Sequence, residues 1–312
     1  LHATEEEARK ETLQQLEVYA DLCENYLAMP VIRGNKTDKE KFAGAVNTYT
    51  IECMMHDKKA LQSGTSHYFG QGFAEQFNIT FTDKDNQQKH PYQTSWGLST
   101  RIIGGLIMTH GDNNGLVLPP RIAPVQVVVV PVAQHKPGVI EKAQELFDSL
   151  KAAGVRVKID TSDNSLGWKC AQYEMKGVPL RIELGPRDIE NGVCMAVRRD
   201  NGEKTSVALS ELADRIHELL DEVQQGLYAK AKRNLDEHTY AAYSLEEAKE
   251  LQERNGGFIK TMWCGDLQCE LDMKEKAGMS SRCIPFAQEK LGEVCACCGK
   301  PAKHMIYWGV AY

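Results

Sequence analysis

The sequence predicts a multidomain chain of mixed α/β and α+β class, and three observations support this prediction. Strand and helix patterns alternate between 125 and 227, which is the βαβ signature of an α/β domain with a mostly parallel sheet. A shift in composition at Pro119-Pro120-Arg121 precedes that region. Beyond Gly256-Gly257 the chain is rich in cysteine, with six of its ten cysteines in the last 49 residues. We therefore expect three domains, at 1–120, 121–225 and 226–312.

The composition is that of a soluble globular protein. The 312 residues are 42% hydrophobic and 26% charged, which is enough chain for two or three domains with cores. The longest largely apolar run, Val125–Val132, is far shorter than the roughly 20 residues of a membrane span. No secretion signal precedes the first helix, so we expect a cytoplasmic protein. The chain lacks an initiator Met, which indicates a start inside a larger protein.

The charge balance does not decide whether the protein binds a nucleic acid. A net charge of −6 argues against a purely electrostatic nucleic-acid binder. Between Lys151 and Thr205, ten Lys and Arg face eight acids, a net of +2 (10 − 8). This excess suits either a polyanionic partner or an ordinary solvated surface.

The N-terminal region predicts a helix followed by strands. Thr4 and Glu7 form a capping box, and apolar residues then recur at helical spacing, so we expect a helix over 4–29 that stops before Pro30. Lys36–Glu40 is a predicted polar loop. Two strands follow at 49–54 and 59–65, the second interrupted by Gly64, with a turn at 57–59. Tyr92–Thr100 leads into the apolar, glycine-rich run Ile102–His110, and we expect a buried strand-to-helix junction there.

The middle region alternates strands and helices. We expect strands at 125–130, 155–159, 180–184 and 194–198, and helices at 139–153 and 210–227. The tail combines two groups of cysteines, Cys264 with Cys269 and Cys295 with Cys297 and Cys298. In a long chain without a secretion signal, such clusters suggest a tetrahedral zinc site, with reduced buried thiols as the alternative. Cys283, in an apolar run, is predicted as a core residue.

Two polar segments of the N-terminal region carry candidate chemistry. Gln62–His67 places a hydroxyl and an imidazole among small residues, but a Ser beside a His in sequence is not a catalytic pair. In Thr94–Arg101, Trp96 could line an apolar pocket, and the Arg101 fork suits a phosphate. A buried structural arginine is the alternative for Arg101.

Together these segments resemble the prolyl-tRNA synthetases of the archaeal/eukaryotic type, a family of class II aminoacyl-tRNA synthetases. Thr94–Arg101 and His110–Arg121 together resemble motif 3 of these enzymes over many residues. The segments that resemble the active site and the anticodon domain occur in the same order as in the family. The matching segments are Lys39–Gly44, Tyr49–Glu52, Gln62–His67, Thr94–Arg101, His110–Arg121, Gly167–Lys169 and Glu174–Asp188. The resemblance implies part of an antiparallel class II catalytic domain, an α/β anticodon-binding domain and a small zinc-binding domain.

The resemblance also implies an activity. Such enzymes activate L-proline with ATP and Mg²⁺ to prolyl-adenylate and transfer the prolyl group to the 3′ end of tRNA(Pro). By this likeness, the nucleotide-binding residues would be Gln62, Thr65, Ser99 and Arg101. The proline pocket would consist of Phe42, His67, Trp96 and Gly97. Glu52 would be an active-site acid. The anticodon-reading residues would be Lys169, Glu174, Arg187 and Asp188. Structural Zn²⁺ would bind Cys264, Cys269, Cys295 and Cys297, with Cys298 as the alternative to Cys297.

The likeness sets further expectations and leaves alternatives. Motif 1, with the homodimer interface, and most of motif 2 should lie before Leu1, so we expect residues 1–312 alone to have little activity. No membrane or DNA partner is expected. A threonyl or glycyl enzyme is disfavoured by Trp96 and by Thr65-Ser66-His67. A non-catalytic RNA-binding or regulatory relative is disfavoured by the intact Gln62, Thr65, His67 and Arg101.

Overall fold

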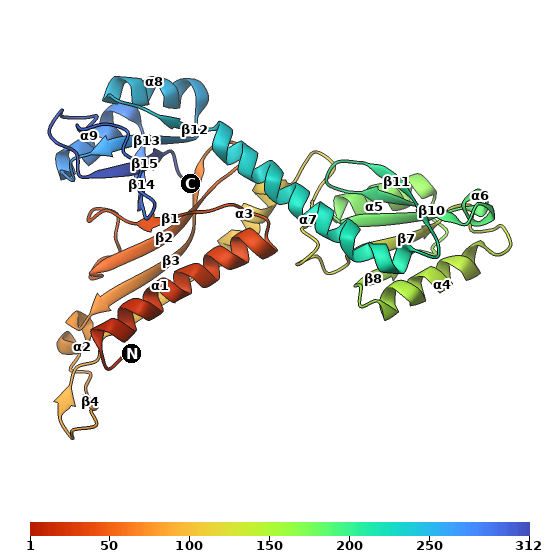
Figure 1. Cartoon of the computed structure of the whole chain (residues 1–312), viewed down its shortest axis with the longest axis horizontal. Helices are drawn as coiled ribbons and strands as arrows, with labels where there is room; N and C mark the ends of the chain where they lie inside the picture. The colour runs from red at the N-terminus through yellow and green to blue at the C-terminus, as the bar shows by residue number, and fades with distance from the viewer. The chain divides into compact units, whose positions relative to one another are not determined.

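The computed structural model describes residues 1–312, which divide into two compact units. The first unit comprises Leu1–Asn25, Met29–Gly105 and Lys232–Tyr312. The second comprises Tyr26–Ala28 and Leu106–Ala231, so it is inserted into the first along the sequence. Figure 1 shows the elements of each unit. None of the helices combines the length and apolar character that a membrane span requires.

One eight-stranded sheet forms the centre of the first unit, in the order β12-β13-β15-β14-β1-β2-β3-β6. Neighbouring strands are antiparallel except for β12 and β13. The strands are β1 (Ile32–Asn35), β2 (Asn47–Met54), β3 (Ala60–Gly70), β6 (Gln93–Gly97), β12 (Thr239–Ala241), β13 (Phe258–Trp263), β14 (Ser280–Pro285) and β15 (His304–Gly309). The remaining elements are α2 (Gly72–Gln76), the pair β4 (Phe81–Thr82) and β5 (Gln88–Lys89), α8 (Leu245–Asn255) and α9 (Leu267–Ala277).

The N-terminal and C-terminal parts of the chain meet between β1 and β14. Gly34 pairs with Pro285, and Asn35 pairs with Ile284. A Cβ at Gly34 would lie 2.4 Å from the Ile284 carbonyl oxygen, so only glycine permits this approach. The cysteine-rich tail therefore continues the sheet that the N-terminal residues begin.

Helix α1 (Glu5–Asp21) covers one face of this sheet (Figure 1). The predicted capping box is confirmed: Thr4 Oγ1 accepts a hydrogen bond from the Glu7 N–H, and the Glu7 carboxylate accepts one from the Thr4 N–H. The predicted helix to Met29 is an α-helix only to Asp21 and continues as a π-helical turn, η1 (Leu22–Tyr26).

One local prediction in this region was wrong in detail. Strand β3 runs through Gly64 without interruption, and its irregularity is a register shift opposite Ile51 and Glu52 that leaves Ser63 unpaired. The predicted strand-to-helix junction is present, because β6 ends at Gly97 and the helix α3 (Arg101–His110) follows it.

The second unit is an α/β domain with a five-stranded sheet in the order β11-β10-β9-β7-β8. Its strands are β7 (Val127–Pro131), β8 (Val157–Ile159), β9 (Leu180–Leu184), β10 (Val193–Arg198) and β11 (Lys204–Ala208). Its helices are α4 (Val139–Ala152), α5 (Leu166–Met175), α6 (Pro186–Glu190) and the first part of α7 (Leu212–Glu237). Helix α7 is longer than the predicted 210–227, and α5 and β11 were not predicted.

The sheet of the second unit is mixed, which corrects the prediction of a mostly parallel sheet. Strand β7 is parallel to β8 and β9, whereas β10 is antiparallel to both β9 and β11. A parallel return needs a crossover of a dozen residues or more. Only the five-residue helix α6 and a short loop separate β9 from β10, and a tight turn with Gly202 at φ +75° joins β10 to β11.

Helices cover the two faces of this sheet to different extents. Helices α4 and α7 bury one face in a core that includes Val127, Leu180 and Ala196. On the other face, α5 packs through Tyr173 over Val128 and Val130. Beyond α5, the row formed by Arg181, Val197 and Lys204 on adjacent strands has no helix above it. This open face is where the second unit presents polar side chains.

Candidate functional site

The first candidate site lies on the sheet of the first unit, on the face that α1 does not cover. Directly paired residues on antiparallel strands point to the same face, and Thr48 pairs with His67 while Thr65 pairs with Gly97. Ser66 lies on the opposite face, because its hydroxyl donates a hydrogen bond to the Thr12 carbonyl of α1. The predicted residues Thr65 and His67 therefore share the open face.

His67 and Phe42 form an aromatic cluster on this face. Their ring centroids are 5.1 Å apart, and Phe69, which sequence reasoning did not identify, lies 5.8 Å from Phe42. Thr48 Oγ1 accepts a hydrogen bond from the Phe42 N–H and is 2.9 Å from His67 Nδ1. Burial lowers the pKa of His67 below its usual value of 6.5, which favours the neutral imidazole at pH 7. The cluster offers apolar ring surface without a charge.

A hollow of about 340 Å³ lies along the same strands, at the start of α3. It brings together Gln62, Thr65, Ser99 and Arg101, and it also includes Gly97, which the resemblance assigned to the proline pocket. The Ser99 hydroxyl accepts a hydrogen bond from the Arg101 N–H, and the exposed Arg101 guanidinium has no ion-pair partner. An unpaired arginine at a helix N-terminus, where the helix dipole is positive, suits an anionic ligand.

The structure corrects the position expected for Trp96. Trp96 pairs directly with Ser66, so its side chain lies on the α1 face, away from His67. There it lines a separate hollow with His2 and Glu11. Gly97 does lie on the open face, where a Cβ would meet no atom within 4 Å.

Glu52 is a structural group, which corrects its expected role as an active-site acid. Its side chain is fully buried, and Oε1 accepts a hydrogen bond from Lys36 Nζ at 2.7 Å. Oε2 accepts from Arg282 at 2.8 and 3.0 Å. Both oxygens are therefore occupied by cations. The polar loop predicted at Lys36–Glu40 is confirmed, although Lys36 at its start is buried.

The second candidate site is the open face of the second unit. Glu174, at the end of α5, accepts a hydrogen bond from Arg181 at 3.0 Å, and Glu183 accepts from the same guanidinium at 2.8 Å. Arg181 was not predicted, although Arg181 and Glu183 alternate with apolar residues in Leu180–Leu184 and so share a strand face. Arg187, on α6, is exposed, and Asp188 accepts a hydrogen bond from the Gly185 N–H.

Lys169 does not belong to this exposed group, contrary to expectation. Its side chain is buried, and Nζ donates to the carbonyl of Asp160 at 3.0 Å and to Gln134 Oε1 at 3.1 Å. A buried ammonium with these partners holds α5 against the ends of the strands. It is not available to read a base.

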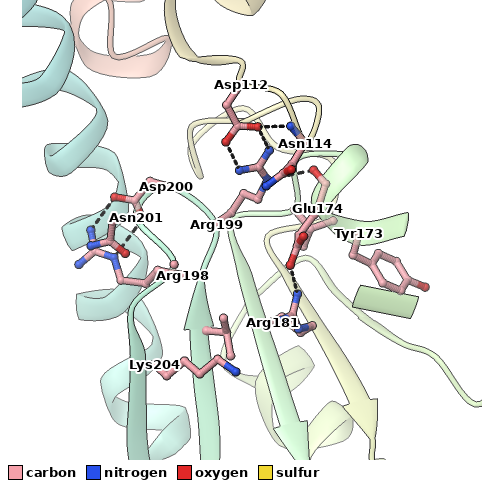
Figure 2. A pocket seen from close by; sticks show the side chains of 13 residues that line it. Asp112, Asn114, Tyr173, Glu174, Arg181, Arg198, Arg199, Asp200, Asn201 and Lys204 are labelled. Atoms are coloured by element: carbon pink, nitrogen blue, oxygen red, sulfur yellow. Dashed lines mark hydrogen bonds and ion pairs between the residues drawn. The ribbon is translucent and has the colours of Figure 1, made fainter. Parts of the chain in front are cut away.

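A cavity of about 460 Å³ adjoins Glu174 and Arg181 (Figure 2). Asp112 and Arg199 form a bidentate ion pair at its edge, at 2.6 and 2.7 Å, and Arg199 Nε donates to the Glu174 carbonyl. The hydrogen bonds from Arg199 lower the pKa of Asp112 to about 2. Neither residue was identified from the sequence, because an ion pair between positions 87 apart leaves no local pattern.

The third candidate site is a cysteine cluster in the first unit. The Sγ atoms of Cys264, Cys269, Cys295 and Cys298 all lie within 4.8 Å of one another. Cys264 Sγ is 3.7 Å from the sulfurs of Cys269 and of Cys298. Cys297, which the sequence prediction preferred, lies outside the cluster and directs its thiol to the Cys269 carbonyl. The geometry therefore replaces Cys297 with Cys298, the alternative.

The cluster fits a tetrahedral zinc ion. Zinc–thiolate bonds of about 2.3 Å imply sulfur–sulfur separations of about 3.8 Å, close to the two distances of 3.7 Å. Two turns shape the site, with Gly265 at φ +89° and Gly299 at φ +70°. The Gly299 N–H also donates to the Cys295 carbonyl. Four thiols at this spacing are a donor set typical of structural zinc sites.

The chain matches three protein families. Residues 2–110 match the tRNA synthetase class II core domain (G, H, P, S and T), and residues 126–219 match the anticodon binding domain. Residues 245–312 match the C-terminal domain of prolyl-tRNA synthetase. Together with the open strand face before α3, these matches make the chain similar to class II aminoacyl-tRNA synthetases.

Curated relatives indicate which class II synthetase the chain resembles. The chain is 59% identical to the proline–tRNA ligase of Lachnospira eligens and 58% identical to that of Clostridium novyi. It is 56% identical to proline–tRNA ligase 2 of Bacillus thuringiensis. Each match covers 100% of this chain and 65% of the relative. The chain is therefore similar to prolyl-tRNA synthetases over its whole length, and it spans 65% of the length of these relatives.

Proposed function

We propose that the chain is the major part of a proline–tRNA ligase, which joins L-proline to tRNA(Pro) at the expense of ATP. The observation that carries the proposal is the open face of β2, β3 and β6. An uncharged aromatic cluster, Phe42 with His67, and a polar hollow ending in the unpaired Arg101 lie along the same strands. A small apolar amino acid and a triphosphate require these two environments side by side.

The chemistry assigns a role to each group. The proline carboxylate attacks the α-phosphorus of ATP, the bond to the β-phosphate oxygen breaks, and pyrophosphate leaves as prolyl-adenylate forms. Phe42 and His67 contact the pyrrolidine ring, while Gln62, Thr65 and Ser99 hold the nucleotide. Arg101 stabilises the negative charge of the phosphates, with Mg²⁺ accompanying ATP. No side-chain nucleophile is required, because positioning and charge stabilisation suffice.

The same proposal extends to the second unit and to the cysteine cluster. Glu174, Arg181 and Arg187 contact bases of the anticodon, because carboxylate and guanidinium groups match the donors and acceptors on base edges. Zn²⁺ held by Cys264, Cys269, Cys295 and Cys298 has a structural role and stabilises the folded tail. The enzyme acts as a homodimer in the cytoplasm.

The proposal is tested with the full-length protein that contains this chain. ATP–pyrophosphate exchange is measured with proline, threonine, glycine and alanine as separate substrates. Exchange with proline alone is the expected result. Exchange with threonine or glycine would assign the chain to another class II enzyme. A folded protein that exchanges with none of the four, yet binds tRNA, would support a non-catalytic RNA-binding relative.

A further inference from the structure

A buried carboxylate in the C-terminal part of the first unit has no cationic partner. Glu270, on α9, is 2% exposed, and its Oε1 accepts hydrogen bonds from the hydroxyls of Thr37 and Ser281. The buried cations of the same region bind Glu52 instead. Burying a charge costs free energy unless the charge is both paired and hydrogen-bonded. Two hydroxyl donors offset only part of this cost, so Glu270 is better suited to fixing the segments that it joins than to adding stability.

One of these segments is the loop that joins β1 to β2, residues 36–46, which carries Phe42. Thr37 Oγ1 donates to Glu270 at 2.8 Å and accepts a hydrogen bond from the Glu40 N–H at 3.3 Å. The Thr37 carbonyl accepts from the same N–H at 3.1 Å and from the next one at 2.9 Å. Thr37 thus caps the turn that precedes Phe42. The carboxylate of a residue 233 positions away holds this cap in place.

Phe42 depends on the backbone of this loop for its position. Its N–H donates to Thr48 Oγ1 at 3.0 Å, and the same oxygen lies 2.9 Å from His67 Nδ1. The Phe42 ring packs against His67 and Phe69. Because Phe42 is 53% exposed, the surrounding side chains restrain it little. The loop backbone therefore decides whether the ring stays against His67.

The other segment is the start of α9, which is fixed from two directions. Glu270 directly follows Cys269 of the cysteine cluster, and Asp266 caps the helix by accepting from the Gln268 N–H at 2.9 Å. Ser281, on β14, donates to the same carboxylate oxygen as the loop does. The carboxylate is therefore held by the tail of the chain, and a hydrogen bond to it restrains the loop.

We propose that Glu270 is a positioning residue for the amino-acid pocket, which acts through Thr37 to keep Phe42 in place. Without this hydrogen bond the loop samples positions in which the ring leaves His67, and only a fraction of the molecules is ready to bind. The apparent affinity for proline falls by that fraction. The hollow at the start of α3 contains no residue of this loop, so ATP binding is unaffected. The inference rests on the proposed function, which makes Phe42 and His67 contacts of the pyrrolidine ring.

The test uses the full-length protein that contains this chain and measures the KM for proline and the KM for ATP in pyrophosphate exchange. Thr37→Val removes the hydroxyl but keeps the shape of the side chain. It is expected to raise the KM for proline roughly tenfold, with the maximal rate and the KM for ATP unchanged. Glu270→Gln loses the charge that strengthens the hydrogen bond and should raise the KM for proline roughly threefold. Thr37→Ser keeps the hydroxyl and should retain the original KM.

Ser281→Ala is the matched control. It removes a hydroxyl from the same oxygen of Glu270 but leaves Thr37 in place, so it should lower stability in urea without changing the KM for proline. Hydrogen exchange followed by mass spectrometry gives a readout that is independent of turnover. Peptides covering 36–46 should exchange faster in Thr37→Val than in Ser281→Ala or the unaltered protein, because only the first variant frees the loop.

Equal increases in the KM for proline and for ATP, or a loss of stability without a change in either, would show that Glu270 has a structural role only. An effect of Ser281→Ala on the KM for proline as large as that of Thr37→Val would lead to the same conclusion. If Glu270→Gln does not fold, Thr37→Val and Thr37→Ser still decide the question. Proline-dependent exchange that no variant alters overturns this inference alone, whereas an unaltered protein without proline-dependent exchange overturns the proposed function as well.

Discussion

Arg282 donates two hydrogen bonds to one oxygen of Glu52, at 2.8 and 3.0 Å, across 230 positions of sequence. Lys36 occupies the other oxygen, and all three side chains are at most 7% exposed. One carboxylate thus balances two buried cations where β1, β2 and β14 come together. The stability of the sheet depends on this carboxylate because its removal leaves both cations without a counterion.

Glu52→Gln is therefore expected to destabilise the fold by about 3–5 kcal/mol, the usual cost of removing one partner of a buried ion pair. The measurement is the free energy of unfolding in urea. Glu17→Gln, which removes a largely exposed partner of Arg33, is the control and should cost less than about 1 kcal/mol. Loss of pyrophosphate exchange in a Glu52→Gln protein of unchanged stability would instead restore the role of an active-site acid.

His110 makes the second unit sensitive to acid. Burial, opposed by a hydrogen bond to the Leu27 carbonyl at 2.8 Å, lowers the pKa of His110 from 6.5 to about 4. The unfolded chain then binds more protons than the folded chain between these values, so stability falls as pH drops from about 6.5 to 4. The contribution is on the order of 3 kcal/mol. Unfolding of the wild type and His110→Gln, followed from pH 7 to pH 4.5, should show a difference that shrinks with falling pH. A constant difference would contradict the shifted pKa.

The cysteine cluster predicts which of two adjacent thiols matters for metal binding. Cys298→Ser should lose most of its bound zinc and unfold at lower temperature, because only three of the four thiolates that a structural zinc ion requires remain. Cys297→Ser should keep one zinc per chain. The measurement is metal content after purification, with thermal unfolding before and after chelator treatment. Retention by Cys298→Ser together with loss by Cys297→Ser would reverse the assignment.

Substitutions of Arg101 and Arg187 should affect different steps, namely activation of proline and binding of tRNA. In the full-length protein, Arg101→Gln should lower proline-dependent pyrophosphate exchange roughly 100-fold, since charge stabilisation of the phosphates is lost. Arg187→Gln should leave exchange unchanged and raise the KM for tRNA. The opposite pattern would contradict the assignment of the ATP phosphate site to the start of α3.

Two glycines with left-handed backbones offer a matched pair in the second unit. Gly177 has φ +70°, and a Cβ there would lie 2.8 Å from Leu116 backbone atoms. Gly192 has φ +67° but open space around it. Gly192→Ala should cost about 1 kcal/mol from backbone strain alone, and Gly177→Ala should cost roughly 1–3 kcal/mol more because of overlap. Equal losses in urea unfolding would show that the contact with Leu116 is not rigid.

Sequence reasoning predicted most elements because their signals are local. The Thr4–Glu7 capping box and the valine-rich strand β7 depend on neighbouring residues. Side chains gathered by one strand, such as Thr65 and His67, were also predictable. In these cases the chain itself brings the residues together.

The errors arose where distant segments decide the outcome. The resemblance implies that Trp96 lies beside His67, but the register of β6 against β3 directs the Trp96 side chain to the α1 face. The resemblance implies functional roles for Glu52 and Lys169, but both side chains are buried with hydrogen-bond partners that the sequence pattern does not indicate. Likewise, nothing local indicates the pairing of Arg199 with Asp112.

The junction of β1 with β14 has a consequence for synthesis on the ribosome. Gly34 emerges 251 residues (285 − 34) before its partner Pro285. At 5–20 residues per second, this gap lasts roughly 10–50 s. Throughout that time β1 exposes one backbone edge, while the complete second unit is translated and free to fold. The nascent N-terminal strands are therefore the part of the chain most in need of a chaperone during translation.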